Sequence, residues 1–245
     1  MNNFEELIIN NKLGIKDLVA FEKESRIYTE IRANELLKAP INGKFDFNHL
    51  KAIHKHLFQD VFQWAGKDRL ELGLKNEFSK PDLKGNITNF VPGVSLHNTA
   101  NQIFTWLKEN NFLKDCKNIN EFSKQISEIY RNLDYLHPFR EGNGRTQRIF
   151  LNQLADNAGY KMDLNIIPKD KIINASAEAI NGNLSELEAL IKENLESFKE
   201  NLTKSQKEPK ITIAEDGTPI MSKKFAKELK KKFAEQDTDK TGIEI

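Results

Sequence analysis

The stretch His137–Arg148, HPFREGNGRTQR, separates two segments whose apolar residues recur at helical spacing. The first segment ends at Leu136, and the second is expected to form a helix over residues 145–158. Because a proline ring disfavours helical geometry at the residue before it, Pro138 predicts that the first helix ends at His137. The pattern therefore predicts a loop that presents the His137 imidazole close to the start of the next helix.

Two residue types in this loop suit a general base and a hard metal ion. A histidine near neutral pH can take a proton from a hydroxyl, and its loop position favours that role for His137 over a purely structural one. Glu141 offers a carboxylate oxygen, which suits Mg²⁺ bridging a polyphosphate better than it suits zinc. The alternative is an arginine-glutamate network that caps the helix.

Anion binding is expected where the second helix starts. Gly142 and Gly144 allow a tight turn and a close approach to a ligand, and the first N–H groups of a helix have no intrahelical partner. At about 100° per residue, Arg145 and Arg148 fall in one narrow sector of the helix. Guanidinium forks match phosphate oxygens. These features predict a nucleotide triphosphate site beside a base, and hence transfer of a phosphorus-containing group to a hydroxyl.

The segment HPFREGNGR, with Arg148 three residues on, resembles the HPFx[D/E]GNGRxxR signature of Fic-domain enzymes at all nine specified positions. Other stretches that look like bacterial Fic proteins lie at residues 11–15, 45–69, 141–160 and 184–195, within residues 1–200. The resemblance implies a mainly α Fic fold, with a helical bundle core and a β-hairpin flap near the active site. The scarcity of glycine (12) and proline (7) agrees with that class.

The resemblance also implies a reaction, in which AMP passes from ATP to a Ser, Thr or Tyr hydroxyl of a target protein and pyrophosphate leaves. His137 would deprotonate the hydroxyl, Glu141 would hold Mg²⁺, and Arg148 would contact the end of the triphosphate. The remaining phosphate contacts would come from Gly142, Asn143, Gly144 and Arg145. Gly144 favours AMP transfer, because a relative that phosphorylates has lysine at that place. Phosphocholine transfer stays open.

The expected flap lies at residues 70–89, where Leu70, Leu72 and Leu74 alternate with other residues and suggest an extended or hairpin element. This segment is longer and richer in Gly, Pro and Lys than the usual flap of the family. Family flaps pair with an extended target segment by strand addition. The candidate strand for that pairing is Leu70–Lys75.

Other helices are predicted from caps and apolar stripes. Asp17 is expected to cap a helix that ends near Ala39-Pro40, and Asn48 to cap the next one. A further helix is expected over about 184–200. The helix after Asn48 carries a stripe that is expected to lie in the core: Leu50, Ile53, Leu57, Phe58, Val61 and Phe62.

The composition changes near residue 203, so we expect a catalytic domain over 1–202 and a linker with a lysine-rich appendage over 203–245. Residues 223–232 hold six lysines, while Phe225, Leu229 and Phe233 share one helical stripe. A solvated helix that docks by its apolar edge is one interpretation of this tail. A nucleic-acid or membrane contact is the other.

Regulation is inferred from a missing motif. Many Fic relatives are restrained by a helix with the pattern [S/T]xxxE[G/N], and the match at residues 105–110, TWLKEN, is interpreted as coincidental because it lies inside an expected core helix. A separate small helical antitoxin is the expected inhibitor. The resemblance suggests ATPase subunits of type II topoisomerases as targets. A host-directed effector and a non-enzymatic, nucleotide-sensing interaction module are the alternatives.

The charge balance argues against a general nucleic-acid binder. The chain has 37 Lys and Arg and 36 Asp and Glu, so its formal charge is +1. A single cysteine, Cys116, excludes an intramolecular disulfide and a multi-cysteine zinc site. No apolar run approaches the roughly 20 residues of a membrane span. The chain is therefore expected to be cytoplasmic.

Overall fold

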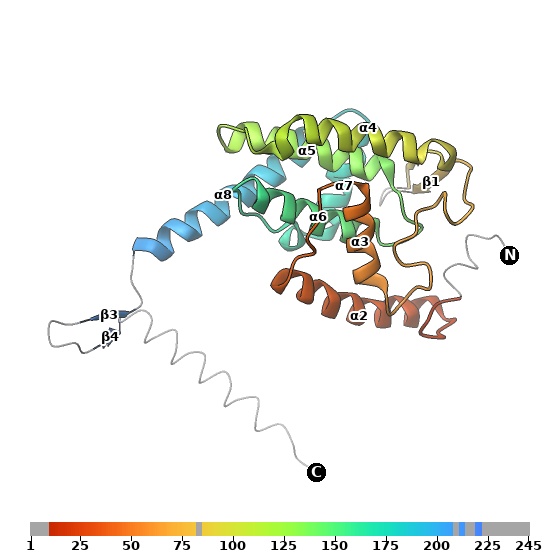
Figure 1. Cartoon of the computed structure of the whole chain (residues 1–245), viewed down its shortest axis with the longest axis horizontal. Coiled ribbons are helices and arrows are strands. Elements are labelled where there is room, and N and C mark those ends of the chain that lie inside the picture. Colours follow the sequence, from red (N-terminus) through yellow and green to blue (C-terminus); the bar gives the residue numbers. More distant parts are fainter. Residues whose placement is uncertain (1–9, 82–84, 208–210, 214–218, 222–245) are drawn as a thin grey trace, which may run out of the picture. The chain divides into compact units, whose positions relative to one another are not determined.

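A computed structural model describes residues 10–81, 85–207, 211–213 and 219–221, and most of them are helical (Figure 1). The chain divides into two units, Met1–Glu196 and Ser197–Ile245. The helices of the first unit include α2 (Leu18–Lys38), α3 (Phe47–Phe58), α4 (Leu96–Glu109), α5 (Ile119–Leu136), α6 (Asn143–Asn157) and α7 (Lys169–Ile180). The short 3-10 turns are η1 (Gly93–Ser95), η2 (Asn111–Leu113) and η3 (Leu164–Ile166). The predicted mainly α class is confirmed.

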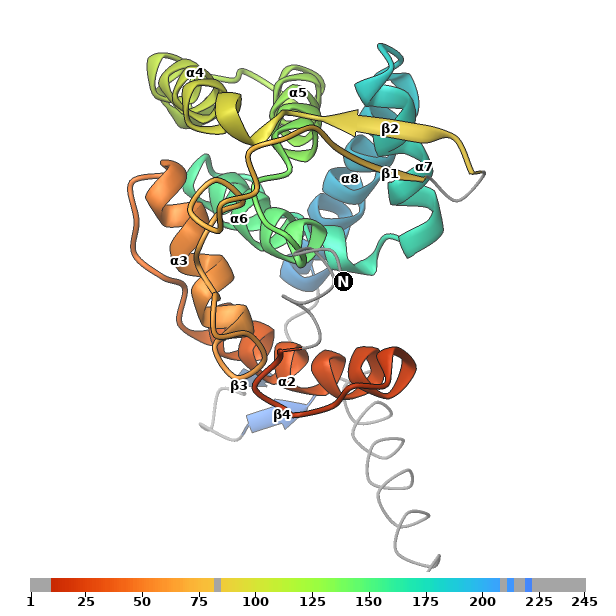
Figure 2. The same ribbon diagram turned by 90° about the vertical axis from the view of Figure 1, so that its right-hand side faces the viewer.

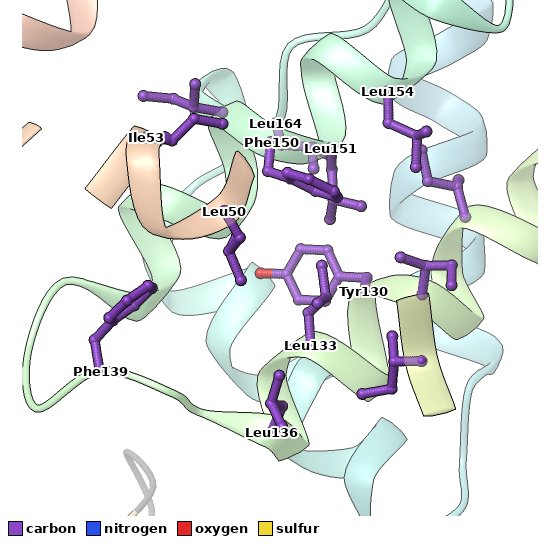
Figure 3. Close-up of a cluster of buried hydrophobic side chains, with 14 of the residues drawn as sticks. Leu50, Ile53, Tyr130, Leu133, Leu136, Phe139, Phe150, Leu151, Leu154 and Leu164 are labelled. Atoms are coloured by element: carbon purple, nitrogen blue, oxygen red, sulfur yellow. The ribbon is translucent and has the colours of Figure 1, made fainter. Parts of the chain in front are cut away.

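Helix α6 is the centre of this unit, because it packs against α3 on one side and α5 on the other (Figure 2). The buried side chains that line these contacts form one cluster (Figure 3). Tyr130 and Leu133 come from α5, Phe150 and Leu154 from α6, and Leu50 from α3. The whole predicted stripe from Leu50 to Phe62 is buried, so its assignment to the core is confirmed.

Helices α2 and α3 are each capped by the side chain of the aspartate just before them. The Asp17 carboxylate accepts a hydrogen bond from the Ala20 N–H, which confirms the predicted cap of α2. The predicted Asn48 cap of α3 is wrong. Asp46 holds that position, because its carboxylate lies two residues earlier and accepts from the His49 N–H at 2.8 Å.

The segment expected to hold the flap does contain an antiparallel hairpin, formed by β1 (Phe78–Pro81) and β2 (Ile87–Phe90). Phe78 pairs with Phe90, and both rings are buried. The expected strand at Leu70–Lys75 is wrong. That segment forms hydrogen-bonded turns, in which the N–H of Leu72 donates to Asp68 and the N–H of Leu74 donates to Arg69.

Helix α8 (Ser185–Lys207) continues beyond residue 203, where the sequence suggested a linker. No glycine or proline lies within this helix. The next proline is Pro209, and a proline ring disfavours helical geometry at the residue before it. Strands β3 (Ile211–Ile213) and β4 (Pro219–Met221) pair with each other in the second unit. The lysine cluster at 223–232 lies outside the described residues, and the division at residue 202 stays a prediction. Among the described helices, none has both the length and the apolar character needed to cross a membrane.

Candidate active site

The loop between α5 and α6 has the geometry that its proline and glycine predict. Helix α5 ends at Leu136, and His137 adopts a left-handed conformation with φ of 42°. Gly142 is the N-cap of α6 with φ of 87°, a value that glycine adopts without strain. The helix begins at Asn143, two residues earlier than predicted, so Gly144 belongs to its first turn. The loop brings His137 and the N-terminus of α6 together.

His137 is buried by the flap rather than presented to solvent. His137 is 8% exposed, and the centroid of its ring lies 4.0 Å from that of Phe90 and 5.6 Å from that of Phe78. Burial lowers the pKa of His137 below its ordinary value of 6.5, and Lys80 lowers it further, while Asp134 acts in the opposite direction. The imidazole is therefore neutral at pH 7.

The two nitrogens of this ring have different surroundings. Nδ1 lies 3.2 Å from the Asp134 carbonyl oxygen and 3.7 Å from the Asp134 carboxylate, so it carries the proton and donates it. The other carboxylate oxygen of Asp134 accepts from the Ser176 hydroxyl of α7. Nε2 has no hydrogen-bond partner among the described residues. A neutral ring with this tautomer leaves the Nε2 lone pair available to accept a proton.

Glu141 lies at the same N-terminus and faces two cations. One carboxylate oxygen accepts from the Gly142 N–H at 2.9 Å and lies 3.6 Å from an Arg145 nitrogen, and the other lies 3.7 Å from Lys80 Nζ. Burial alone would raise the pKa of Glu141, but Lys80, the Gly142 N–H and Arg145 together lower it. The side chain is therefore an ionised carboxylate.

The donor set at Glu141 suits Mg²⁺ that is shared with a phosphate. The described residues contain no group of three or more His, Cys, Asp and Glu side chains that could enclose a metal ion. Mg²⁺ is commonly held by one or two carboxylates, with phosphate oxygens and waters completing its octahedron. A single ionised carboxylate beside an anion-binding helix end fits that pattern.

Asn143 holds the loop through its side chain. Its Oδ1 accepts from the Phe139 N–H at 2.8 Å, and its Nδ2 donates to the Phe139 carbonyl at 2.7 Å. Both ends of the side-chain amide are thus engaged. The group of Asn143 that can bind an anion is its backbone N–H in the first turn of α6. The Phe139 ring is buried and anchors the loop in the core.

The two arginines of α6 are held by different neighbours. Arg145 Nη1 donates to Thr29 Oγ1 of α2 at 2.9 Å, and its guanidinium lies 4.7 Å from the centroid of the Phe58 ring. Arg148 Nε donates to Asn165 Oδ1 of η3 at 3.1 Å. Burial lowers the pKa of Arg145, yet the group stays charged at pH 7 because an arginine titrates far above that pH. The predicted sharing of one helix sector thus brings the two guanidiniums to different neighbours, Arg145 to α2 and α3 and Arg148 to η3.

His54 of α3 is a contributor that the sequence did not single out. Its Nε2 lies 3.0 Å from the Glu141 carbonyl oxygen, and its Nδ1 accepts from the Gly66 N–H at 2.8 Å. The ring stacks on Phe139 with centroids 3.8 Å apart. Complete burial lowers the pKa of His54 to about 3, so the ring is neutral. Its one sequence signal is a histidine placed within an apolar helical stripe.

The TWLKEN segment at 105–110 belongs to α4 and to the turn that follows it. Leu107 is buried in the core, while Glu109 is exposed. No ion pair joins Glu109 to either arginine of α6 among the described residues. The interpretation of this motif as coincidental agrees with that placement.

Comparison with known proteins gives consistent matches. The Fic/DOC family profile matches residues 44–155. The chain is 39% identical over 194 residues to protein adenylyltransferase VbhT of Bartonella schoenbuchensis, covering 79% of this chain and 38% of that relative. It is 31% identical to the probable protein adenylyltransferase y4lH of Sinorhizobium fredii, covering 76% of this chain and 90% of the relative. The chain thus spans well under half of the first relative and most of the second.

Solved structures agree with these relatives. The BepC protein of Bartonella tribocorum, with bound AMPPNP, has a TM-score of 0.65 and 27% identity, covering 76% of this chain and 90% of that one. An N-terminal Fic domain of Bartonella quintana, with bound ADP, has a TM-score of 0.67 and 31% identity, covering 76% and 89% of the two chains. With the helix-loop-helix motif, the hairpin and these relatives in agreement, the chain belongs to the Fic/DOC family.

Proposed function

We propose that this chain is a protein adenylyltransferase, which moves AMP from ATP to a Ser, Thr or Tyr hydroxyl of a target protein. The observation that carries the proposal is the unpartnered Nε2 of a neutral, buried His137 beside the N-terminus of α6. The adenylyltransferase names of the relatives and the nucleotides in two solved Fic structures support it. The activity belongs to the cytoplasm, where ATP is abundant.

The proposed transfer needs a base and an anion cradle. His137 Nε2 takes the proton of the target hydroxyl, and the Asp134 carbonyl and carboxylate stabilise the resulting imidazolium through Nδ1. The hydroxyl oxygen forms a bond to the α-phosphorus of ATP, and the bond from that phosphorus to the bridging oxygen of pyrophosphate breaks. The first N–H groups of α6, with Arg145 and Arg148, stabilise the negative charge of the phosphates.

Labelled ATP tests the reaction. Incubation with type II topoisomerase ATPase subunits as the acceptor should place label from α-³²P-ATP, and none from γ-³²P-ATP, on protein. Label from γ-³²P-ATP alone would indicate phosphorylation instead.

Mass spectrometry of the acceptor should find AMP on a hydroxyl within an extended segment, because we propose that the target pairs with an edge of hairpin β1–β2. An adduct confined to helical segments would contradict that docking mode.

We propose that Glu141 binds Mg²⁺ together with the phosphates of ATP. The bound ion would neutralise phosphate charge. Glu141→Gln keeps the size of the side chain and removes the charge, so the Mg²⁺-dependent gain in ATP affinity should fall by about tenfold. Calorimetric titration of ATP with Mg²⁺ and with EDTA measures that gain. Equal gains in the variant and in wild type would contradict the assignment.

We also propose that a separate small helical antitoxin restrains the chain. The support is that the described residues carry no [S/T]xxxE[G/N] helix paired with the arginines of α6. Induced expression of the chain alone should slow bacterial growth, and His137→Ala should remove the effect. Normal growth with active wild-type chain present would contradict an external inhibitor.

A further inference from the structure

Arg69 is a fully buried arginine that contacts the active-site loop without belonging to the motif. It follows the turn after α3 and is 1% exposed. Its Nε donates to the His137 carbonyl at 2.7 Å, and its backbone N–H donates to the Pro138 carbonyl at 2.8 Å. One residue therefore holds two successive carbonyl groups at the point where α5 stops.

These two hydrogen bonds bear directly on the conformation of His137. Its φ of 42° lies in the left-handed region, which is unfavourable for an L-residue that carries a side chain. The His137 and Pro138 carbonyls belong to the two peptide bonds that follow His137, and fixing both of them opposes relaxation of this strained backbone. The direction of the imidazole depends on that backbone, so Arg69 contributes to the placement of Nε2.

The same guanidinium also contacts the hairpin. Its Nη2 donates to the Val91 carbonyl, immediately after β2, at 2.6 Å and to the Leu136 carbonyl at 3.3 Å. Its Cζ lies 4.6 Å from the centroid of the Phe78 ring in β1. Arg69 thus contacts the end of α5, strand β1 and the residue that follows β2 through one rigid planar group.

The charge of Arg69 is balanced mainly by these dipoles. Its guanidinium donates to three backbone carbonyls, while the neighbouring Asp68 carboxylate is engaged by Lys51 and His97. Burying a guanidinium costs free energy that an apolar residue of similar size would not cost. A lysine could not reproduce the fork, since it offers one nitrogen in place of a planar group.

We propose that Arg69 is a positioning residue that fixes the general base and the target-binding hairpin in one arrangement. This inference rests on the proposed AMP transfer, in which His137 and hairpin β1–β2 must meet the same hydroxyl. Its effect falls on catalysis and on target affinity. Nucleotide affinity depends on the start of α6, which Arg69 does not contact through any of these hydrogen bonds.

Arg69→Lys tests the proposal through separate kinetic constants. We expect kcat for AMP transfer to fall by about ten- to a hundredfold, because a misplacement of about 1 Å can cost a hundredfold. KM for the target protein should rise severalfold, while the Kd for ATP stays within twofold. Arg32→Lys is the control, because the Arg32 guanidinium also makes fixed hydrogen bonds, in a half-buried ion pair with Asp60, but lies on α2. It should leave kcat within twofold.

Hydrogen exchange gives a readout that does not need activity. In the wild-type chain, the amides of residues 87–90 and of His137 should open with the same free energy, because Arg69 joins them. The two free energies should differ in Arg69→Lys, although the Val91 N–H still donates to the Tyr135 carbonyl there. Independent opening, or a folded Arg69→Lys variant with kcat and KM within twofold of wild type, would overturn the inference. Absence of transfer by the wild-type chain would overturn the proposed function instead, while the exchange result would still decide the role of Arg69.

Discussion

Replacing His137 with alanine should reduce AMP transfer by about a thousandfold, within the range expected for loss of a general base. The variant lacks His137 Nε2, the ring nitrogen that has no hydrogen-bond partner among the described residues and can accept the hydroxyl proton. ATP binding should stay within twofold, because the first turn of α6 is unchanged. Incorporation of α-³²P label, together with calorimetry of ATP binding, measures both effects.

The fold should survive this change. The structure buries His137 against Phe90, so only a small loss of thermal stability is expected. His97→Ala is the control, because His97 lies on α4, outside the loop, and pairs with Asp68. Undiminished transfer by a folded His137→Ala variant would contradict the proposed mechanism.

The pH dependence of wild-type kcat gives a second check on the base. Burial lowers the pKa of His137, so the ring loses its proton at a lower pH than a solvent-exposed histidine does. Transfer should therefore rise with pH through a midpoint below 6.5 and stay constant above it. The acid limb should be absent from the residual activity of His137→Ala.

Gly142→Ala should destabilise the protein by about 2–5 kcal/mol and remove most of the transfer activity. A Cβ atom at this position would lie 2.3 Å from Cζ of the buried Phe58 ring, and φ of 87° is unfavourable for alanine. Relief of the overlap requires movement of the loop that joins Glu141 to α6. Chemical denaturation and the labelled-ATP assay measure the two losses.

Gly159→Ala separates the backbone term from the overlap. Gly159 has nearly the same φ, 85°, but a Cβ there would meet nothing within 4 Å. It should cost only about 1–2 kcal/mol and leave AMP transfer unchanged, since it lies after the last turn of α6. Equal destabilisation by the two substitutions would show that close packing against Phe58 contributes nothing.

Much of the fold follows from local rules that act within a few residues. Asp17 caps α2 and Pro138 ends α5, as predicted, because each effect involves only neighbouring backbone groups. The failures arose where competing local signals were close together, as with Asp46 and Asn48, or where signals were weak. Helix α7 was not predicted, because alanines such as Ala175 and Ala179 form much of its buried face and give little apolar contrast.

The flap shows how tertiary contacts override a short alternating pattern. Leu70, Leu72 and Leu74 predicted a strand, but Asp68 and Arg69 draw this segment into turns through their backbone carbonyls. The strands lie instead at Phe78–Pro81 and Ile87–Phe90, where the paired Phe78 and Phe90 rings pack against His137. Burial of those rings decides the register.

The family motif and the candidate roles of His137, Glu141 and the residues up to Arg148 follow from the sequence alone, as do the helix ends on either side to within two residues. Those features depend on residue type and on backbone geometry at adjacent positions. The folded arrangement was needed to show that Nε2 of His137 is the nitrogen without a partner among the described residues, that His54 holds the Glu141 carbonyl and that Arg69 joins the loop to the flap. Each of these depends on burial, or on hydrogen bonds between residues far apart in the chain, which spacing along the sequence does not encode.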